Sequence, residues 1–103
     1  MSRLSETVII TSAGEGIPSD ETLQNEQNYL SAEVDVDNRD VCLKFSSRQA
    51  LYDFAISLLQ EAVFGDGSQK EFYPLISDGK ALVVEGVRLV DGSSRIFVTY
   101  GEN

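Results

Sequence analysis

The sequence predicts an α+β domain, in which one amphipathic helix packs on one face of a mainly antiparallel sheet of about six strands, in the order βββαβββ. Apolar residues recur at helical spacing in one long central segment, and short β-rich segments separated by turn residues lie on both sides of it. The length of 103 residues and a hydrophobic content of 42% suit one domain, residues 1–103, with one core.

The first predicted strand is the β-branched segment ETVIIT, residues 6–11. Residues 12–28 follow, with two glycines, a proline and few apolar side chains. They predict a long acidic loop within the domain, with room for a short helical turn after Ser19 or Asp20.

Residues 29–36 and 41–46 alternate between apolar and polar side chains, and the turn residues Asp37 to Asp40 lie between them. This pattern predicts a β-hairpin with one buried and one solvent-exposed face. The side chains expected to point inward are Leu30, Ala32, Val34, Val36, Val41, Leu43 and Phe45, and those expected to point outward are Glu33, Asp35, Cys42 and Lys44.

The helix is expected to begin at Ser46 or Ser47, and Ser46 followed by Gln49 fits a capping box. It is expected to run for about 17 residues and to stop near Gly65. Its apolar positions are Leu51, Phe54, Ala55, Leu58, Leu59, Ala62 and Val63.

Three strands are predicted after the helix. The segment 71–76 contains Pro74, which favours an edge position, and the segment 81–90 reads as one long strand in which Gly86 marks a bulge. The turn sequences SDGK and DGSS, around residues 78 and 92, would join these two segments to RIFVTY, residues 95–100, as a meander.

The charge is strongly negative and uneven. The net charge is −9; residues 1–40 hold nine acidic and two basic residues, and residues 41–103 hold eight acidic and six basic residues. Such a surface argues against nucleic acid as a partner, because a phosphate backbone needs a basic surface. No segment approaches the roughly 20 apolar residues of a membrane span, and no secretory signal is recognisable, so we expect a cytoplasmic protein without a membrane partner.

The usual groups for catalysis and metal binding are missing. The chain has no histidine and one cysteine, Cys42, which excludes an internal disulfide and the common zinc sites. No phosphate-binding, dinucleotide-binding or nucleophile-elbow motif occurs. Residues 35–40 only begin like a calcium loop, since Asp40 occupies the position of its required glycine. We therefore expect no enzyme, no cofactor and no metal, and Cys42 as an inert strand residue.

The acidic residues of the first forty positions have two interpretations. They are the solvated side of an antiparallel hairpin, or they form one negative surface, together with Glu15, that steers a basic partner toward the protein. Tyr29 would add an aromatic anchor to such a surface. The residues predicted to bind a partner are Asp20, Glu21, Glu26, Tyr29, Glu33, Asp35, Asp37 and Asp40.

In its size, its acidity, its lack of histidine and its layout around the helix ALYDFAISLLQEAVF, the chain resembles the small single-domain immunity proteins. Bacteria make these proteins against polymorphic or contact-dependent growth-inhibition toxins. The resemblance implies a cytoplasmic inhibitor that binds a cognate toxin domain, often a basic nuclease, and blocks its active site.

Two further interpretations stay open. The chain could be a non-catalytic accessory or scaffold subunit of a bacterial complex, and as a homodimer it could pair through the strand edges at 71–76 or 95–100. It could also mimic nucleic acid and inhibit a DNA-binding protein, which requires acidic side chains spaced like phosphates.

Overall fold

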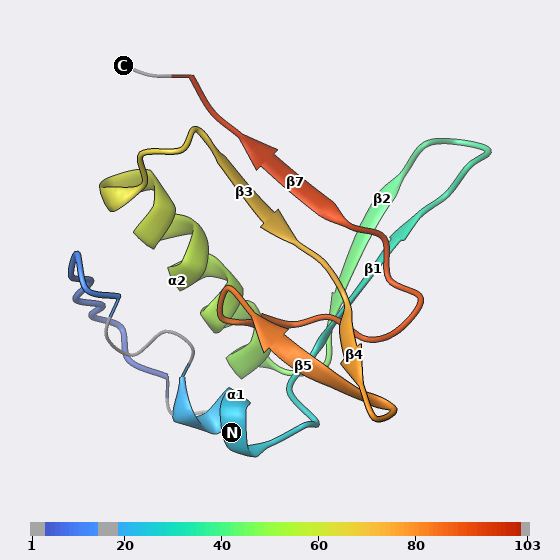
Figure 1. Ribbon diagram of the computed structural model, residues 1–103, viewed down its shortest axis with the longest axis horizontal. Coiled ribbons are helices and arrows are strands. Elements are labelled where there is room, and N and C mark those ends of the chain that lie inside the picture. Colours follow the sequence, from blue (N-terminus) through green and yellow to red (C-terminus); the bar gives the residue numbers. More distant parts are fainter. Residues whose placement is uncertain (1–3, 15–18, 102–103) are drawn as a thin grey trace.

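The computed structural model describes residues 4–14 and 19–101. The elements are α1 (Asp20–Gln24), β1 (Leu30–Val34), β2 (Val41–Phe45), α2 (Arg48–Phe64), β3 (Gln69–Phe72), β4 (Leu75–Ser77), β5 (Lys80–Val84), β6 (Val87–Arg88) and β7 (Ile96–Thr99). The named strands pair antiparallel and α2 is the main helix (Figure 1), which confirms the predicted α+β class. Within the described residues, seven strands form three small sheets, β1–β2, β3–β7 and β4–β5–β6, where the sequence suggested a single sheet of six.

The predicted strand 71–76 is divided into β3 and β4. Tyr73 and Pro74 separate the two strands. Proline has no backbone N–H to donate to a ladder and restricts the residue before it, so the chain bends here and enters a different sheet.

The prediction of one long strand at 81–90 is wrong. Glu85 and Gly86 have φ angles of 54° and 85°, and two consecutive residues in this region form the tight turn of a two-residue hairpin. Val84 therefore pairs with Val87 across the turn. Gly86 is thus a turn residue, and the expected bulge does not form.

The meander consists of different strands from those predicted. The hairpin at Asp78 and Gly79, with φ angles of 51° and 76°, joins β4 to β5 as expected. The chain also turns at Gly92, but β7 does not pair with the strand before that turn; it pairs with β3, and Ile96 lies opposite Phe72. The observed meander is β4–β5–β6.

The predicted strand at residues 6–11 is also wrong, because this segment is neither helix nor strand. Side chains of α2 hold it along the helix: the Tyr52 hydroxyl donates to the carbonyl of Ser5 at 2.8 Å, and the Gln60 amide donates to the carbonyl of Thr11 at 2.6 Å. Strand propensity alone does not form a strand when no sheet edge is adjacent.

The helix α2 has the predicted length of 17 residues. Ser47 caps it, since its hydroxyl accepts from the Ala50 N–H at 3.1 Å. The capping box of Ser46 and Gln49 is wrong: the Ser46 hydroxyl accepts from the Tyr29 N–H, and the Gln49 amide donates to Asp53 at 3.0 Å. These two side chains join the start of α2 to β1 and to the next helical turn.

Gly65 ends α2 as expected, but with a φ of −68°. Glycine is needed here because a Cβ atom would lie 2.5 Å from the carbonyl oxygen of Glu61 and would also meet its carboxylate. We predict that Gly65→Ala lowers the free energy of unfolding by about 2 kcal/mol, measured by urea denaturation. Gly67→Ala is the control, because a Cβ there would have its nearest neighbour at 4.0 Å. Equal stabilities of the two variants would contradict the steric explanation.

The core joins α2 to all three sheets. Its buried members are Leu30, Phe54, Phe72, Val87 and Leu89, and Phe45, Leu58, Ile96 and Val98 pack against them. The ring of Phe54 lies 4.9 Å from that of Phe72 and 5.5 Å from that of Phe45, between centroids. Because the sheets share this one core, the β1–β2 hairpin is anchored at its base.

Candidate partner-binding surface

The β1–β2 hairpin extends from the body of the protein (Figure 1). Only its base is covered: Leu30 and Ala32 are buried, and their carbonyls accept from the N–H groups of Val90 at 3.1 Å and Ser94 at 2.8 Å. Further along the hairpin, an open groove separates it from residues 94–97. We call residues 33–44, its distal part, the arm.

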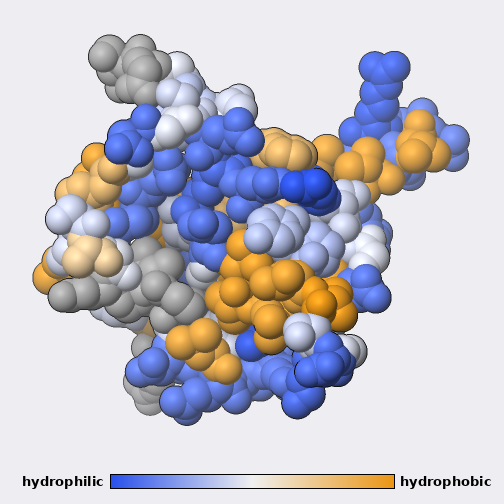
Figure 2. Space-filling view, viewed as in Figure 1, coloured by the Kyte–Doolittle hydropathy of each residue, from blue (hydrophilic) through white to orange (hydrophobic). Residues whose placement is uncertain are grey.

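The prediction of a buried apolar face is wrong for the arm. Val34 is 50% exposed, Val41 68% and Leu43 37%, and Val36 is also exposed. In the space-filling view the arm stands out from the body and carries hydrophobic as well as strongly hydrophilic side chains (Figure 2). Exposed apolar side chains on a protruding hairpin are typical of an interaction surface.

The turn of the arm is ordered by its own acidic side chains. The Asp35 carboxylate accepts from the N–H groups of Asp37 at 2.9 Å and Asn38 at 3.3 Å. The Asn38 side chain accepts from the Asp40 N–H at 2.8 Å, and Arg39 has a φ of 66°. This confirms the predicted turn chemistry, and it leaves Asp37 and Asp40 exposed at the end of the arm.

The structure does not bring the predicted acidic residues together on one surface. Asp20 and Glu21 lie in the first turn of α1, and Figure 1 places α1 and the turn of the arm at opposite ends of the molecule. Glu15 lies outside the described residues. The expectation of a single negative surface is therefore wrong. The predicted acidic residues form two separate groups, and the group on the arm is the larger one.

Two of the predicted acids have basic neighbours. The Glu33 carboxylate lies 3.3 Å from the ammonium of Lys44, and the Glu26 carboxylate lies 3.6 Å from that of Lys80. All four side chains are more than half exposed, so each pair contributes less than about 1 kcal/mol. Asp35, Asp37 and Asp40 form no ion pair with any described residue, and together with Arg39 they give the turn of the arm a net charge of −2.

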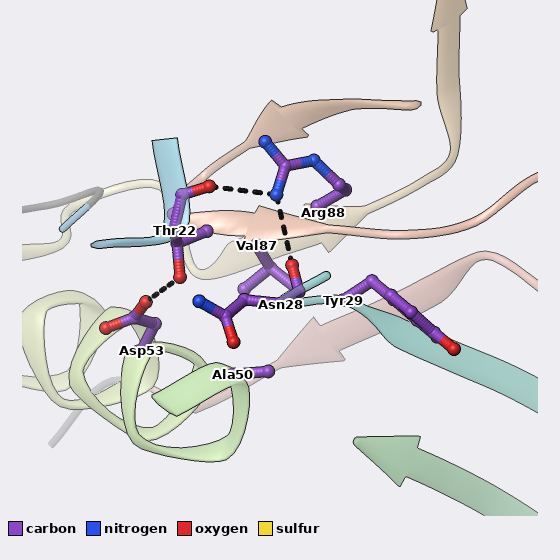
Figure 3. Close-up of a pocket in the computed structure, with 8 residues that line it drawn as sticks. Thr22, Asn28, Tyr29, Ala50, Asp53, Val87 and Arg88 are labelled. Atoms are coloured by element: carbon purple, nitrogen blue, oxygen red, sulfur yellow. Dashed lines mark hydrogen bonds between the residues drawn. The ribbon is translucent and has the colours of Figure 1, made fainter. Parts of the chain in front are cut away.

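Tyr29 lies at the base of the arm. It is half-buried, and its N–H donates to the Ser46 hydroxyl at 2.8 Å. Figure 3 shows its ring directed away from the buried polar groups of Asp53 and Arg88. Tyr29 is consequently separated from the acidic turn by the length of the arm.

An open groove runs between the arm and β7. It encloses about 240 Å³, and apolar side chains of Val34, Val41, Leu43 and Phe97 line it. The Arg95 guanidinium lies 5.3 Å from the centre of the Phe97 ring and forms an ion pair with Glu71. The groove is mainly apolar, and its charged lining residues are Glu33 and Arg95.

A buried network holds α1 against the body (Figure 3). Arg88 in β6 donates to the carbonyls of Thr22 at 2.8 Å, Asn25 at 3.0 Å and Asn28 at 3.1 Å, and to that of Ala81 at 3.1 Å. The first three carbonyls lie in α1 or just after it, where a helix leaves such groups without partners inside the helix. A cation at this end also compensates the helix dipole.

Asp53 on α2 completes this network. Its carboxylate accepts from the hydroxyls of Ser19, at 2.7 Å, and Thr22, and from the Gln49 amide. The space enclosed by the network has essentially no volume for even a water molecule. These charged groups are therefore structural and form no ligand site.

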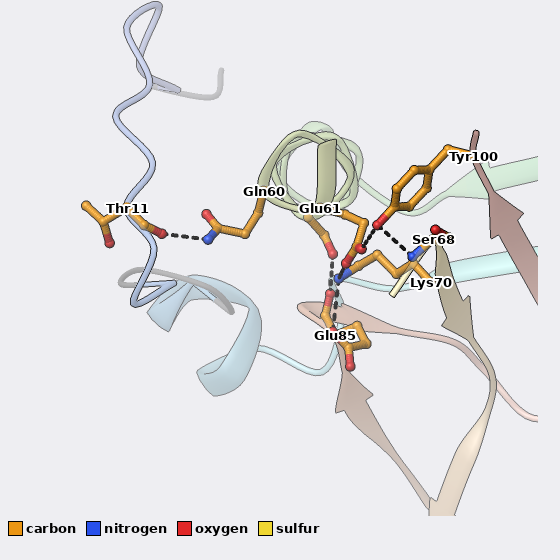
Figure 4. Close-up of polar contacts among 8 residues, drawn as sticks. Thr11, Gln60, Glu61, Ser68, Lys70, Glu85 and Tyr100 are labelled. Carbon is orange, nitrogen blue, oxygen red and sulfur yellow. Dashed lines mark hydrogen bonds and ion pairs between the residues drawn. The ribbon is translucent and has the colours of Figure 1, made fainter. Parts of the chain in front are cut away.

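A second polar cluster joins the C-terminal end of α2 to β3 and to the β5–β6 turn (Figure 4). The Lys70 ammonium lies 3.0 Å from the Glu85 carboxylate and 3.9 Å from that of Glu61, and the Tyr100 hydroxyl donates to Glu61 at 2.5 Å. An open groove of about 340 Å³, lined by Leu58, Ala62 and Val98, adjoins this cluster. Its polar groups hold neighbouring elements together.

In the described ranges, 4–14 and 19–101, no group of three or more Cys, Asp or Glu is placed to hold a metal ion. None of the helices in those ranges has the length and apolar character needed to cross a membrane. Cys42 is exposed on β2. Comparisons with protein-family models, with curated proteins and with solved structures give no match.

Proposed function

We propose that this chain is a non-catalytic binding protein of the immunity type, which neutralises a basic toxin domain in the cytoplasm without a cofactor. The arm would be its recognition element. The partner would place lysine or arginine side chains around the exposed carboxylates of Asp37 and Asp40.

The observation that carries this proposal is the acidic turn at the end of the arm. Hydrogen bonds from Asp37, Asn38 and Asp40 N–H groups to neighbouring side chains hold the turn in one conformation. A surface that is ordered before binding loses less conformational entropy in the complex. The net charge of −9 adds a long-range field that attracts a basic partner and increases the rate of encounter.

The arrangement of the other charged groups supports a role without catalysis. Arg88, Asp53 and Lys70 are engaged in contacts that join structural elements. Among the residues that line the two grooves described above, Glu61 and Tyr100 hydrogen-bond to each other, Arg95 pairs with Glu71, and Glu33 pairs with Lys44. This leaves the exposed arm as the feature best suited to a function.

A charge-reversal experiment tests the proposal. Wild-type chain, Asp37→Lys/Asp40→Lys and Asp66→Lys/Asp91→Lys are immobilised and exposed to a lysate of the source bacterium. The two variants change the charge equally, and all four positions are exposed. We expect wild type and the Asp66/Asp91 variant to retain the same basic protein, and the Asp37/Asp40 variant to retain at least about tenfold less of it.

Co-expression provides the functional readout. The captured protein should arrest growth when expressed alone, and the wild-type chain should restore growth. Failure of the wild-type chain to restore growth, or equal capture of the protein by all three chains, would contradict the proposal.

The alternative function, a homodimeric accessory subunit, is favoured by a different observation. The apolar side chains of Val34, Val41 and Leu43 on the arm are exposed, although apolar and polar residues alternate along these strands as they do in a strand with one buried face. A second protein surface that covers them would account for this pattern.

A further inference from the structure

The strand β2 has a free edge. It pairs with β1, and on its other side no strand of the described residues lies against it. In contrast, the outer edge of β1 is covered, since the carbonyls of Leu30 and Ala32 accept from Val90 and Ser94. Proteins usually protect a free edge of this kind, because its backbone groups bind other strands.

The hydrogen bonds at the two ends of the hairpin show which backbone groups are free. The Asp35 N–H donates to the Asp40 carbonyl, and the Ser46 N–H donates to that of Tyr29. In an antiparallel pair the groups that face the partner belong to every second residue. The N–H and C=O groups of Cys42 and Lys44 therefore face β1, and those of Val41, Leu43 and Phe45 face away from it.

We propose that β2 pairs with β2 of a second copy, antiparallel and across a two-fold axis at Leu43, to form a four-stranded sheet β1–β2–β2–β1. This inference goes beyond the proposed function and does not depend on it. In this register Leu43 lies opposite Leu43 of the second copy, and Val41 lies opposite Phe45. Each of these residues has an outward-facing N–H and C=O, so every backbone bond of the new pair can form.

The side chains are complementary in the same register. Leu43 would meet its copy between the two Ala32 side chains, because Ala32 is the neighbour of Leu43 within each hairpin. Val41, which is exposed in the single chain, would be covered by Phe45. On the other face Lys44 would lie opposite the uncharged Cys42, so no like charges face each other directly.

The register places the turn of one copy beside the start of α2 of the other. Asp40 of one copy would lie opposite Ser46 of the other, and Arg39 would lie opposite Ser47, the N-cap of α2. The dimer would thus cover part of the turn, and a basic partner bound at the turn would compete with the dimer.

Sedimentation equilibrium on the purified chain tests the proposal. We expect wild type to dimerise, and Leu43→Lys, which places two ammonium groups face to face at the axis, to raise the dimer dissociation constant at least about tenfold. Leu82→Lys is the matched control, because Leu82 has a similar exposure and lies on β5, opposite the exposed Leu75 of β4. It should dimerise like wild type.

A cross-link tests the register independently of the charge variant. Lys44→Cys places a thiol opposite Cys42 of the second copy, within disulfide distance, and mild oxidation should give a covalent dimer. Wild type should not cross-link, because its two Cys42 residues would be offset by two positions along the strands, too far apart for a disulfide.

Three results would overturn this dimer: a monomeric wild type at every concentration, a dimer that Leu82→Lys dissociates and Leu43→Lys does not, or efficient cross-linking of wild type through Cys42. These measurements use the isolated chain. A failed dimer therefore leaves the binding of a basic partner unaffected, and a failed partner capture leaves the dimer unaffected.

Discussion

Phe72→Ala should lower the free energy of unfolding by roughly 3–5 kcal/mol, the largest loss that we expect from a single substitution in this chain. Phe72 is completely buried, and its ring packs on Phe54 at the centre of the core shared by α2 and the three sheets. Alanine would remove this aromatic contact and leave a cavity that the surrounding strands cannot close. Urea denaturation followed by circular dichroism measures the loss.

Phe97→Ala is the matched control, since Phe97 lies on β7, the strand paired with β3, but is 57% exposed. Its truncation should cost less than about 1 kcal/mol. If both variants lost the same stability, the core would not be centred on Phe72.

Arg88→Met should lower the free energy of unfolding by about 3 kcal/mol. Methionine keeps the length of the side chain but removes the donors to the carbonyls of Thr22, Asn25 and Asn28. Each buried carbonyl left without a partner costs about 1–3 kcal/mol, and the removal of a buried charge offsets part of this sum. The same denaturation measurement applies, and α1 should in addition exchange its amide hydrogens faster.

Two further variants separate geometry from charge at this position. Arg88→Lys keeps the positive charge, but one ammonium group cannot reproduce the planar fork of donors, so we expect less than half of the lost stability to return. Arg48→Met, at an exposed arginine, should change stability by no more than about 0.5 kcal/mol. A stability of Arg88→Met equal to that of Arg48→Met would show that the buried network is not needed to hold α1.

Local patterns were sufficient to predict α2 and the β1–β2 hairpin. The apolar positions from Leu51 to Val63 recur at helical spacing over several turns, and Gly65 marks the end of that pattern. Residues 29–46 alternate on both sides of a turn rich in aspartate and asparagine. In both elements the hydrogen bonds connect residues close in sequence.

Long-range pairing could not be predicted in the same way. The partner of β7 is β3, which precedes it by more than twenty residues, and no property of RIFVTY distinguishes β3 from the nearer strand. The turn at Glu85 and Gly86 was not predicted because the surrounding valines and leucines form an apolar run in which Glu85 and Arg88 are the only charged residues. Strand propensity at 6–11 likewise gave no information about whether a sheet edge was adjacent.

The candidate site was predicted only in part. The acidic turn of the arm follows from the composition of residues 35–40, but its separation from α1 depends on how the hairpin leaves the core. The buried roles of Arg88 and Asp53 were missed, although each had a signal: Arg88 lies between Val87 and Leu89, and Asp53 shares a helix face with Ala50 and Ser57. A charged residue at a core position indicates a satisfied polar network.

The proposal that the acidic turn binds a basic protein is tested most directly by the association rate constant with the captured partner, measured as a function of ionic strength. For wild type and Asp66→Lys/Asp91→Lys we expect a fast rate that falls steeply with added salt. For Asp37→Lys/Asp40→Lys we expect a rate about 10- to 100-fold slower at low salt, with little further dependence on salt. Equal rates and equal salt dependence for the two variants would show that the arm is not the surface that the partner meets.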